Sequence, residues 1–185
     1  MKGLLAVVIL LASCSSGAYA LDGFESVKCG ANIPNVLIGK HMLAERVVVI
    51  EGRHKELGLK DLGGLGISER LFLHSWLICG SEYQLLEEAR HDDTVVRDVV
   101  LFPPHSKSTP EFMGTCRVED HEISDAIVAV LDNQAGQRVN GPLPRPLLPA
   151  KTAWKIDEGK ARFVKIGSTG LRCPVDGIIT VDSIY

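Results

Sequence analysis

The residues that could carry out chemistry are scattered along the chain, and one short group combines a base with nucleophiles. His105-Ser106-Lys107-Ser108 brings together an imidazole, an amine and two hydroxyls, with Asp98 shortly before it. Nucleophilic catalysis requires a hydroxyl beside a base that a third group orients, and adjacency in sequence does not provide that arrangement. The chain contains neither Gly-x-Ser-x-Gly nor Ser-x-x-Lys. We therefore predict no catalytic residues and assign His105, Ser106, Lys107 and Ser108 to a binding surface.

Imidazoles and carboxylates also occur together in two charged segments, His91-Asp92-Asp93 and Glu119-Asp120-His121-Glu122. Both segments are typical of turns, where solvation alone favours charged residues, so we predict no metal site and no cofactor. His74 is a different case, because it lies inside an apolar segment between Phe72 and Trp76. A buried imidazole needs a hydrogen-bond partner, and we interpret His74 as a structural residue of a sheet.

Composition and motifs disfavour two kinds of binding. The glycine-rich segment Gly63-Gly64-Leu65-Gly66 matches neither Gly-x-x-x-x-Gly-Lys-Ser/Thr nor Gly-x-Gly-x-x-Gly, the patterns of phosphate-binding loops. Without Lys2, which lies in the export signal described below, the chain holds 19 basic and 23 acidic residues, a net charge of −4. No basic stripe interleaved with aromatic residues occurs, as nucleic-acid binding would require. We therefore predict no nucleic-acid partner.

The first 20 residues have the pattern of an export signal, with Lys2 before an apolar run and Ala18-Tyr19-Ala20 at the end. The run is shorter than the roughly 20 residues of a membrane-spanning helix, so we predict no transmembrane helix. A second interpretation is a bacterial lipobox, Leu11-Ala12-Ser13-Cys14, in which Cys14 would be lipidated. Both routes predict an extracytoplasmic protein, periplasmic or secreted, that is anchored to a membrane only through a lipid on Cys14.

Four cysteines remain once Cys14 is removed with the signal or lipidated: Cys29, Cys79, Cys116 and Cys173. An even number of cysteines in an oxidising compartment predicts disulfides. No pair has the Cys-x-x-Cys spacing of a zinc site. Four cysteines permit three pairings, and the sequence does not choose among them.

The elements that position these side chains are organised around an apolar segment, Arg70 to Cys79, which ends at Gly80. Apolar residues occupy both alternating faces, so we predict a strand that is covered on both sides. The β-branched segment Arg46 to Glu51 predicts a second core strand. The stretch Gly52 to Glu69 mixes glycines with leucines and predicts a leucine-anchored loop, because each glycine costs a helix roughly 1 kcal/mol.

The segment Glu82 to Arg90 is ambiguous, because its composition favours a helix while its neighbours favour a hairpin. We predict a strand that pairs with Thr94 to Phe102, with a short helix as the alternative. Pro103 to Pro110 must be a loop, since three prolines remove backbone donors. Further strands are predicted at 112–119, 126–131, 153–157 and 161–166, the last two as a hairpin, with a proline-rich connector at 140–149.

These elements predict a mostly β fold, a single-domain sandwich or barrel of about eight strands over residues 21–185, or an α+β fold if 82–90 is helical. For function, we predict a non-enzymatic binding, inhibitor-like or envelope-associated protein with an unknown protein or envelope partner. The alternative is a small extracytoplasmic hydrolase whose catalytic dyad is assembled from distant residues. A deep pocket with His105 or His74 beside a carboxylate would favour the hydrolase, and a flat, exposed apolar patch would favour a partner.

Overall fold

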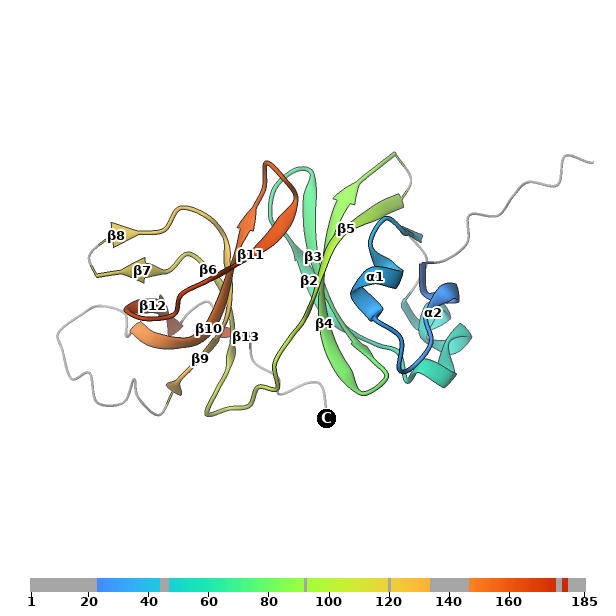
Figure 1. Ribbon diagram of the computed structural model, residues 1–185, viewed down its shortest axis with the longest axis horizontal. Coiled ribbons are helices and arrows are strands. Elements are labelled where there is room, and N and C mark those ends of the chain that lie inside the picture. The colour runs from blue at the N-terminus through green and yellow to red at the C-terminus, as the bar shows by residue number, and fades with distance from the viewer. Residues whose placement is uncertain are drawn as a thin grey trace, which may run out of the picture.

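The computed structural model describes residues 23–43, 47–91, 93–119, 121–133, 147–175 and 178–179. The predicted export signal with Cys14, and residues 140–146 of the predicted connector, lie outside the described residues. Within these ranges the chain is mostly β, as predicted, with two antiparallel sheets and a few short helices (Figure 1). The described residues form thirteen strands, four of which have only two or three residues. None of the described helices is long and apolar enough to cross a membrane.

Five strands from the first part of the chain form one sheet, in the order β1-β5-β4-β3-β2. Their bounds are His41–Leu43 (β1), Lys60–Gly66 (β2), Leu71–Ile78 (β3), Ser81–Ala89 (β4) and Asp93–Leu101 (β5). The apolar segment at 70–79 is therefore a strand, as predicted. The ambiguous segment at 82–90 is also a strand, as predicted, and it pairs with β5 instead of forming the helix of the alternative.

Both faces of β3 are covered, which confirms the prediction from its two apolar faces. On one face, Trp76 and Ile78 are buried in a cluster with residues of the N-terminal helices. On the other face, Leu71 and Leu73 are buried in a cluster with residues of the second sheet. The five-stranded sheet is consequently the middle layer, between the helices and the second sheet (Figure 1).

The helices are short, and one of them corrects a prediction. Their bounds are Gly23–Ser26 (η1), Ile33–Leu37 (α1), Val47–Arg53 (α2) and Lys55–Leu57 (η2). We predicted a strand at 46–51, but α2 occupies this segment. Ile50 is buried in the core whereas Val49 is 47% exposed, so the segment buries one side only, as a surface helix does. The carboxylate of Glu51 also accepts a hydrogen bond from the backbone N–H of Asp61, and these tertiary contacts outweigh β propensity.

The predicted loop at 52–69 is also partly wrong, because residues 60–66 form the edge strand β2. Leu57 and Leu59 are buried, as the predicted leucine anchors should be. Gly64 is paired with His74, and a Cβ on Gly64 would collide with the His74 ring. Glycine therefore permits a close approach between two strands here instead of a turn.

The second sheet has the order β13-β6-β9-β10-β12-β7-β8, with β11 paired to β10 outside this path. The bounds are Glu111–Gly114 (β6), Arg117–Val118 (β7), His121–Glu122 (β8), Ile127–Leu131 (β9), Leu147–Asp157 (β10), Arg162–Ile166 (β11), Leu171–Pro174 (β12) and Ile178–Ile179 (β13). The predicted hairpin is formed by β10 and β11, and the predicted strand at 126–131 corresponds to β9. The predicted strand at 112–119 is divided into β6 and β7.

Two disulfides connect the four predicted cysteines, Cys29 with Cys79 and Cys116 with Cys173. They span 50 and 57 residues, so each is expected to stabilise the fold by roughly 3–4 kcal/mol. The first joins the segment before α1 to the end of β3, and the second joins the segment after β6 to β12. Two intramolecular disulfides are typical of extracytoplasmic proteins.

The loop Pro103 to Pro110 leads from β5 in the first sheet to β6 in the second, and we call it the crossing loop. It contains no strand apart from an isolated bridge between Ser106 and Thr109, which confirms the predicted loop. Between the sheets, apolar residues of both sheets share one core cluster, to which Phe102 belongs just before the loop. The loop therefore carries its side chains along the junction of the two sheets.

Candidate functional site

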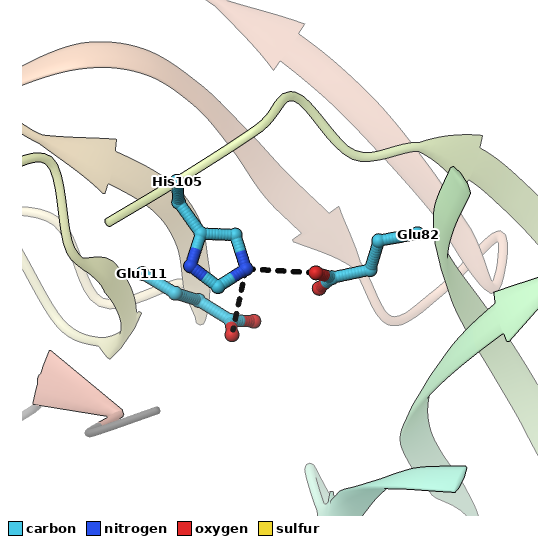
Figure 2. Close-up of side chains that lie close together, drawn as sticks. All are labelled: Glu82, His105 and Glu111. Carbon is cyan, nitrogen blue, oxygen red and sulfur yellow. Dashed lines mark hydrogen bonds and ion pairs between the residues drawn. The ribbon is translucent and has the colours of Figure 1, made fainter. Parts of the chain in front are cut away.

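His105 lies on the crossing loop and is directed at two carboxylates from different sheets (Figure 2). Its Nε2 lies 2.7 Å from Oε2 of Glu82, a hydrogen-bond distance, and 4.0 Å from Oε2 of Glu111. Glu82 is near the start of β4, and Glu111 is the first residue of β6. Pro103, Pro104 and Pro110 restrict the backbone on both sides of His105. The fold thus brings together an imidazole and two carboxylates, although Glu82 lies 23 positions before His105 and Glu111 lies 6 positions after it.

Gln84 fixes the orientation of both carboxylates. Its Nε2 donates hydrogen bonds to Oε1 of Glu82, at 2.9 Å, and to Oε1 of Glu111, at 2.8 Å. Its own carbonyl oxygen accepts a hydrogen bond from the hydroxyl of Ser75, at 2.7 Å, on the neighbouring strand β3. Because the two Oε1 atoms are held by the amide, the two Oε2 atoms are the ones that face the imidazole.

The strand register explains how these polar groups reach the interior. Glu82 and Gln84 alternate with their neighbours in β4 and lie on the same face as Leu86, the face toward the second sheet. Ser75 is the register partner of Gln84, so its hydroxyl lies beside the amide. Two polar residues on the inward face of a buried strand are unusual, and this alternation is the sequence signal that could have pointed to the site.

The three side chains are largely removed from solvent, with exposed fractions of 13% for Glu82, 8% for His105 and 6% for Glu111. Burial, followed by the nearby charge of Glu82, raises the pKa of Glu111 to about 7. The hydrogen bond to Glu82 is the main cause that raises the pKa of His105 above its usual value. At neutral pH, therefore, Glu111 is divided between its protonated and ionised forms.

A pocket of about 730 Å³ opens beside this group, at the junction of the two sheets. Glu82 and His105 form part of its wall, and Glu111, which they contact, is not among the lining residues. The rest of the lining is mainly apolar: Leu77, Leu101, Phe102, Pro103, Pro104 and Trp154, with Gly80, Ser81, Thr152 and Lys165. Apolar walls with a few polar groups directed inward are the usual composition of a ligand site.

Lys165 and Trp154 form the side of the pocket that belongs to the β10–β11 hairpin. The Lys165 ammonium lies over the Trp154 ring, 5.9 Å from its centroid, and the ring of Trp154 is 5.8 Å from that of Phe102. Lys165 is exposed and makes no ion pair with any carboxylate of the described residues. Within the described part of the chain, it is therefore a positive charge at the pocket that no acidic neighbour neutralises.

The four predicted binding residues separate into a buried part and an exposed part. We expected an exposed loop, but the His105 side chain is buried, because it is directed between the sheets. Ser106 and Lys107 are exposed and Ser108 is half-buried. The Ser106 hydroxyl contacts those of Ser108 and Thr109, each at 3.0 Å, and none of these contacts reaches the imidazole.

The other groups considered from sequence do not assemble into sites. Asp98 accepts hydrogen bonds from the backbone N–H groups of Phe163 and Val99, so it is a structural acid between β5 and β11. Asp93 forms an ion pair with His41 at 2.6 Å. Among the residues that the structure describes, Glu82, His105 and Glu111 are the grouping of three metal-ligating side chains, and the described members of the two charged segments, residues 91, 93, 119, 121 and 122, belong to none.

His74 has a carboxylate neighbour of its own, Glu87 on β4. Nδ1 of His74 lies 3.4 Å from Oε1 of Glu87, an ion-pair distance without hydrogen-bond geometry. The second oxygen of Glu87 accepts a hydrogen bond from the hydroxyl of Thr94. The Glu87 side chain is 3% exposed, and its proximity raises the pKa of His74. This pair has no third ligand and does not border the pocket.

No protein-family model, curated protein or solved structure matches this chain.

Proposed function

We propose that the protein is an extracytoplasmic binding protein that holds a small amphipathic ligand, an apolar body with an acidic group, in the pocket between its sheets. The observation that carries the proposal is the pocket itself, which combines apolar walls with the unneutralised ammonium of Lys165. The sequence prediction of a non-enzymatic binding protein agrees with this proposal, and the first half of the crossing loop forms part of the wall.

The walls favour a ligand with an apolar body. Trp154, Phe102 and the two prolines offer flat surfaces, and Leu101 is 56% exposed at the pocket. A ligand that covers this exposed leucine buries apolar surface, and each Å² removed from water favours binding by roughly 25 cal/mol. Because Phe102 is itself buried and packed in the core, this part of the wall is formed before a ligand arrives.

The polar groups favour an acidic end on that ligand. Both oxygens of Glu82 already accept hydrogen bonds, from Gln84 and from His105, so this carboxylate has little capacity left for a basic ligand. Lys165 offers three N–H donors and a positive charge, and Thr152 adds a hydroxyl. A carboxylate or similar anion is the complement to these donors.

Titration with octanoate and with 3-phenylpropionate, followed by Trp154 fluorescence, tests this proposal, with octylamine as the basic control. We expect saturable binding of the two acids and weaker binding of the amine. Leu101→Glu should reduce the affinity for the acids by roughly tenfold or more, since it places a negative charge at the pocket beside their carboxylate. Leu65→Glu is the matched control, because Leu65 is a 41% exposed leucine outside the pocket lining. Equal effects of the two substitutions, or no binding of either acid, would contradict the proposal.

A small hydrolase is the second candidate, and the contact between His105 and Glu82 at the pocket wall favours it. A histidine beside a carboxylate is the arrangement of a general base and the group that orients it. The exposed Ser106 does not supply the nucleophile, because its hydroxyl contacts Ser108 and Thr109. Hydrolysis of 4-nitrophenyl esters that falls by about 100-fold in His105→Gln would support this candidate, and turnover equal to that of buffer would exclude it for these substrates.

The location of the protein is part of the proposal. The two disulfides support an extracytoplasmic compartment, and the choice between a released and a lipid-anchored protein depends on Cys14. Membrane association that is lost in Cys14→Ala would establish the anchor. A soluble protein whose mature mass begins at Leu21 would establish cleavage after Ala20 instead.

A further inference from the structure

We propose that Glu82, His105 and Glu111 bind a divalent transition-metal cation at the inner wall of the pocket. The three ligand atoms would be Nε2 of His105 and one oxygen of each carboxylate, and these atoms all lie within 4.8 Å of one another. Imidazole and carboxylate ligands together suit zinc and its first-row neighbours. This proposal goes beyond the ligand pocket and does not depend on the identity of the organic ligand.

The spacing of the ligand atoms fits such a cation. With bonds of about 2.0–2.1 Å in a tetrahedral site, neighbouring ligand atoms lie about 3.3 Å apart. The two distances from Nε2, 2.7 Å to Glu82 and 4.0 Å to Glu111, are one shorter and one longer than this spacing. A small displacement of the imidazole toward Glu111 would make them equal, and Figure 2 shows Nε2 directed at both carboxylates.

An outer shell for the cation is already in place. The Gln84 amide holds the Oε1 atom of each carboxylate, so both Oε2 atoms are directed at Nε2 before any cation arrives. Ser75 holds the amide in turn through its hydroxyl. Outer-shell hydrogen bonds of this kind orient ligands in metal sites, and their loss typically reduces metal affinity by 10–100-fold.

The second nitrogen of the imidazole leaves the tautomer of His105 unfixed. The His105 side chain is 8% exposed, and its Nδ1 is buried without a hydrogen-bond partner among the described residues. Buried polar atoms without partners are rare and require an explanation. Because nothing fixes the tautomer through Nδ1, Nε2 can present either its proton to Glu82 or its lone pair to a cation.

The charges of the group match those of a divalent cation. Two ionised carboxylates and a neutral imidazole carry a charge of −2, which one divalent cation neutralises inside a largely buried site. Entry is possible through the pocket, since Glu82 and His105 form part of its wall. The bound cation would keep one coordination position directed at the pocket, where an acidic ligand could reach it.

The pair of His74 and Glu87 provides a matched control. It too combines a histidine with a buried glutamate, but Thr94 occupies the second oxygen of Glu87, and among the described residues the pair belongs to no cluster of three metal-ligating side chains. A histidine with one carboxylate is a weak chelator, so a substitution in this pair should leave metal binding unchanged.

Calorimetric titration of the untagged, chelator-treated protein with Zn²⁺ tests the proposal, and Co²⁺ absorption reports the coordination geometry. We expect one Zn²⁺ per chain and no saturable binding of Mg²⁺. Glu111→Gln and Glu82→Gln, which preserve side-chain shape, should each reduce the Zn²⁺ affinity by about 100-fold or more, because losing a ligand costs more than losing an outer-shell partner. Ser75→Ala should reduce it by roughly tenfold, and Glu87→Gln should not change it.

Several results would overturn the proposal. Absence of stoichiometric Zn²⁺ binding would do so, as would an affinity in Glu111→Gln and Glu82→Gln equal to that of the parent protein. Circular dichroism establishes that each variant is folded, and if one variant does not fold the other provides the same test. An equal loss in Glu87→Gln would place the cation elsewhere and would also contradict it. The organic acids are absent throughout, so this result is separate from that of the ligand titration.

Discussion

On each side of the five-stranded sheet a tryptophan lies near a histidine–glutamate pair: Trp76 with His74 and Glu87 on the helix side, and Trp154 of β10 with His105 and Glu82 on the side of the second sheet. On the face covered by helices, Trp76 is 3% exposed and its ring lies edge-on to that of Phe24, with 5.0 Å between centroids. On the face toward the second sheet, Trp154 is half-buried and lines the pocket. The first tryptophan fills the core, and the second leaves a surface that a ligand can cover.

The two histidine–glutamate pairs differ in what surrounds the glutamate. Each oxygen of the Glu87 carboxylate has one neighbour: His74 lies beside the first, and the Thr94 hydroxyl donates a hydrogen bond to the second. Glu82 shares its surroundings with a second carboxylate, Glu111, and an amide holds both. The comparison indicates that a histidine beside one buried acid is a stabilising pair, whereas a second, partly protonated acid beside such a pair marks a candidate functional site.

The largest expected difference between the two faces concerns the tryptophans. Trp76→Ala should lower the free energy of unfolding by roughly 3–5 kcal/mol, because it opens a cavity among fully buried neighbours. Trp154→Ala should cost roughly 1–2 kcal/mol, since its ring is half-buried and borders solvent. Urea denaturation of both variants measures the contrast. Losses of equal size would mean that the pocket side is packed as tightly as the helix side.

The sequence predicted the strands with the strongest alternation and the loop with the most prolines. The segment at 70–79 has apolar residues on both faces, and its two faces are covered by different layers. The β10–β11 hairpin alternates clearly, and its register follows that pattern. In these segments local preference and tertiary packing favour the same structure, which is why sequence reasoning succeeded.

The predictions failed where a distant contact decided the outcome. The run at 47–50 is β-branched, yet packing of Ile50 and the contact of Glu51 with Asp61 make it helical. Gly64 resembled a loop residue, and the ring of His74 is what requires a glycine there. Likewise, no local pattern connects His105 with Glu111, because the crossing loop and Gln84 bring them together in space.

A second contrast concerns the pH dependence of stability in chelator-treated protein. The pKa of Glu111 is about 7 in the folded protein and about 4.5 when unfolded, so the folded state binds more protons between these values. The contribution of Glu111 to the free energy of unfolding is therefore fully present below about pH 4.5 and is lost as the pH rises through about 7. The raised pKa of His105 acts with the same sign, with stability lost as the pH rises through its folded value.

Glu111→Gln should flatten this dependence by up to about 3 kcal/mol between pH 5 and 8, at 1.36 kcal/mol per pKa unit. Glu87→Gln should flatten it much less, because His74 is 38% exposed and solvent screens its ion pair. Unfolding free energies measured across this pH range for the three proteins test the difference. A profile for Glu111→Gln that matches the parent protein would show that the acid is ionised throughout.

The smallest expected effect distinguishes the two halves of the crossing loop. Lys107 is exposed, so Lys107→Ala should change stability by no more than about 0.5 kcal/mol, and it should leave octanoate affinity unchanged because Lys107 does not line the pocket. His105→Ala should lower the free energy of unfolding by roughly 2 kcal/mol, since it removes the hydrogen bond to Glu82 and leaves two buried carboxylates without the imidazole beside them. If Lys107→Ala abolishes capture of a protein from the native compartment while the pocket still binds octanoate, the exposed half is a separate contact surface. If instead Lys107→Ala weakens octanoate binding as strongly as Leu101→Glu does, the ligand extends over the whole loop, and the division between a buried pocket wall and an exposed turn is wrong.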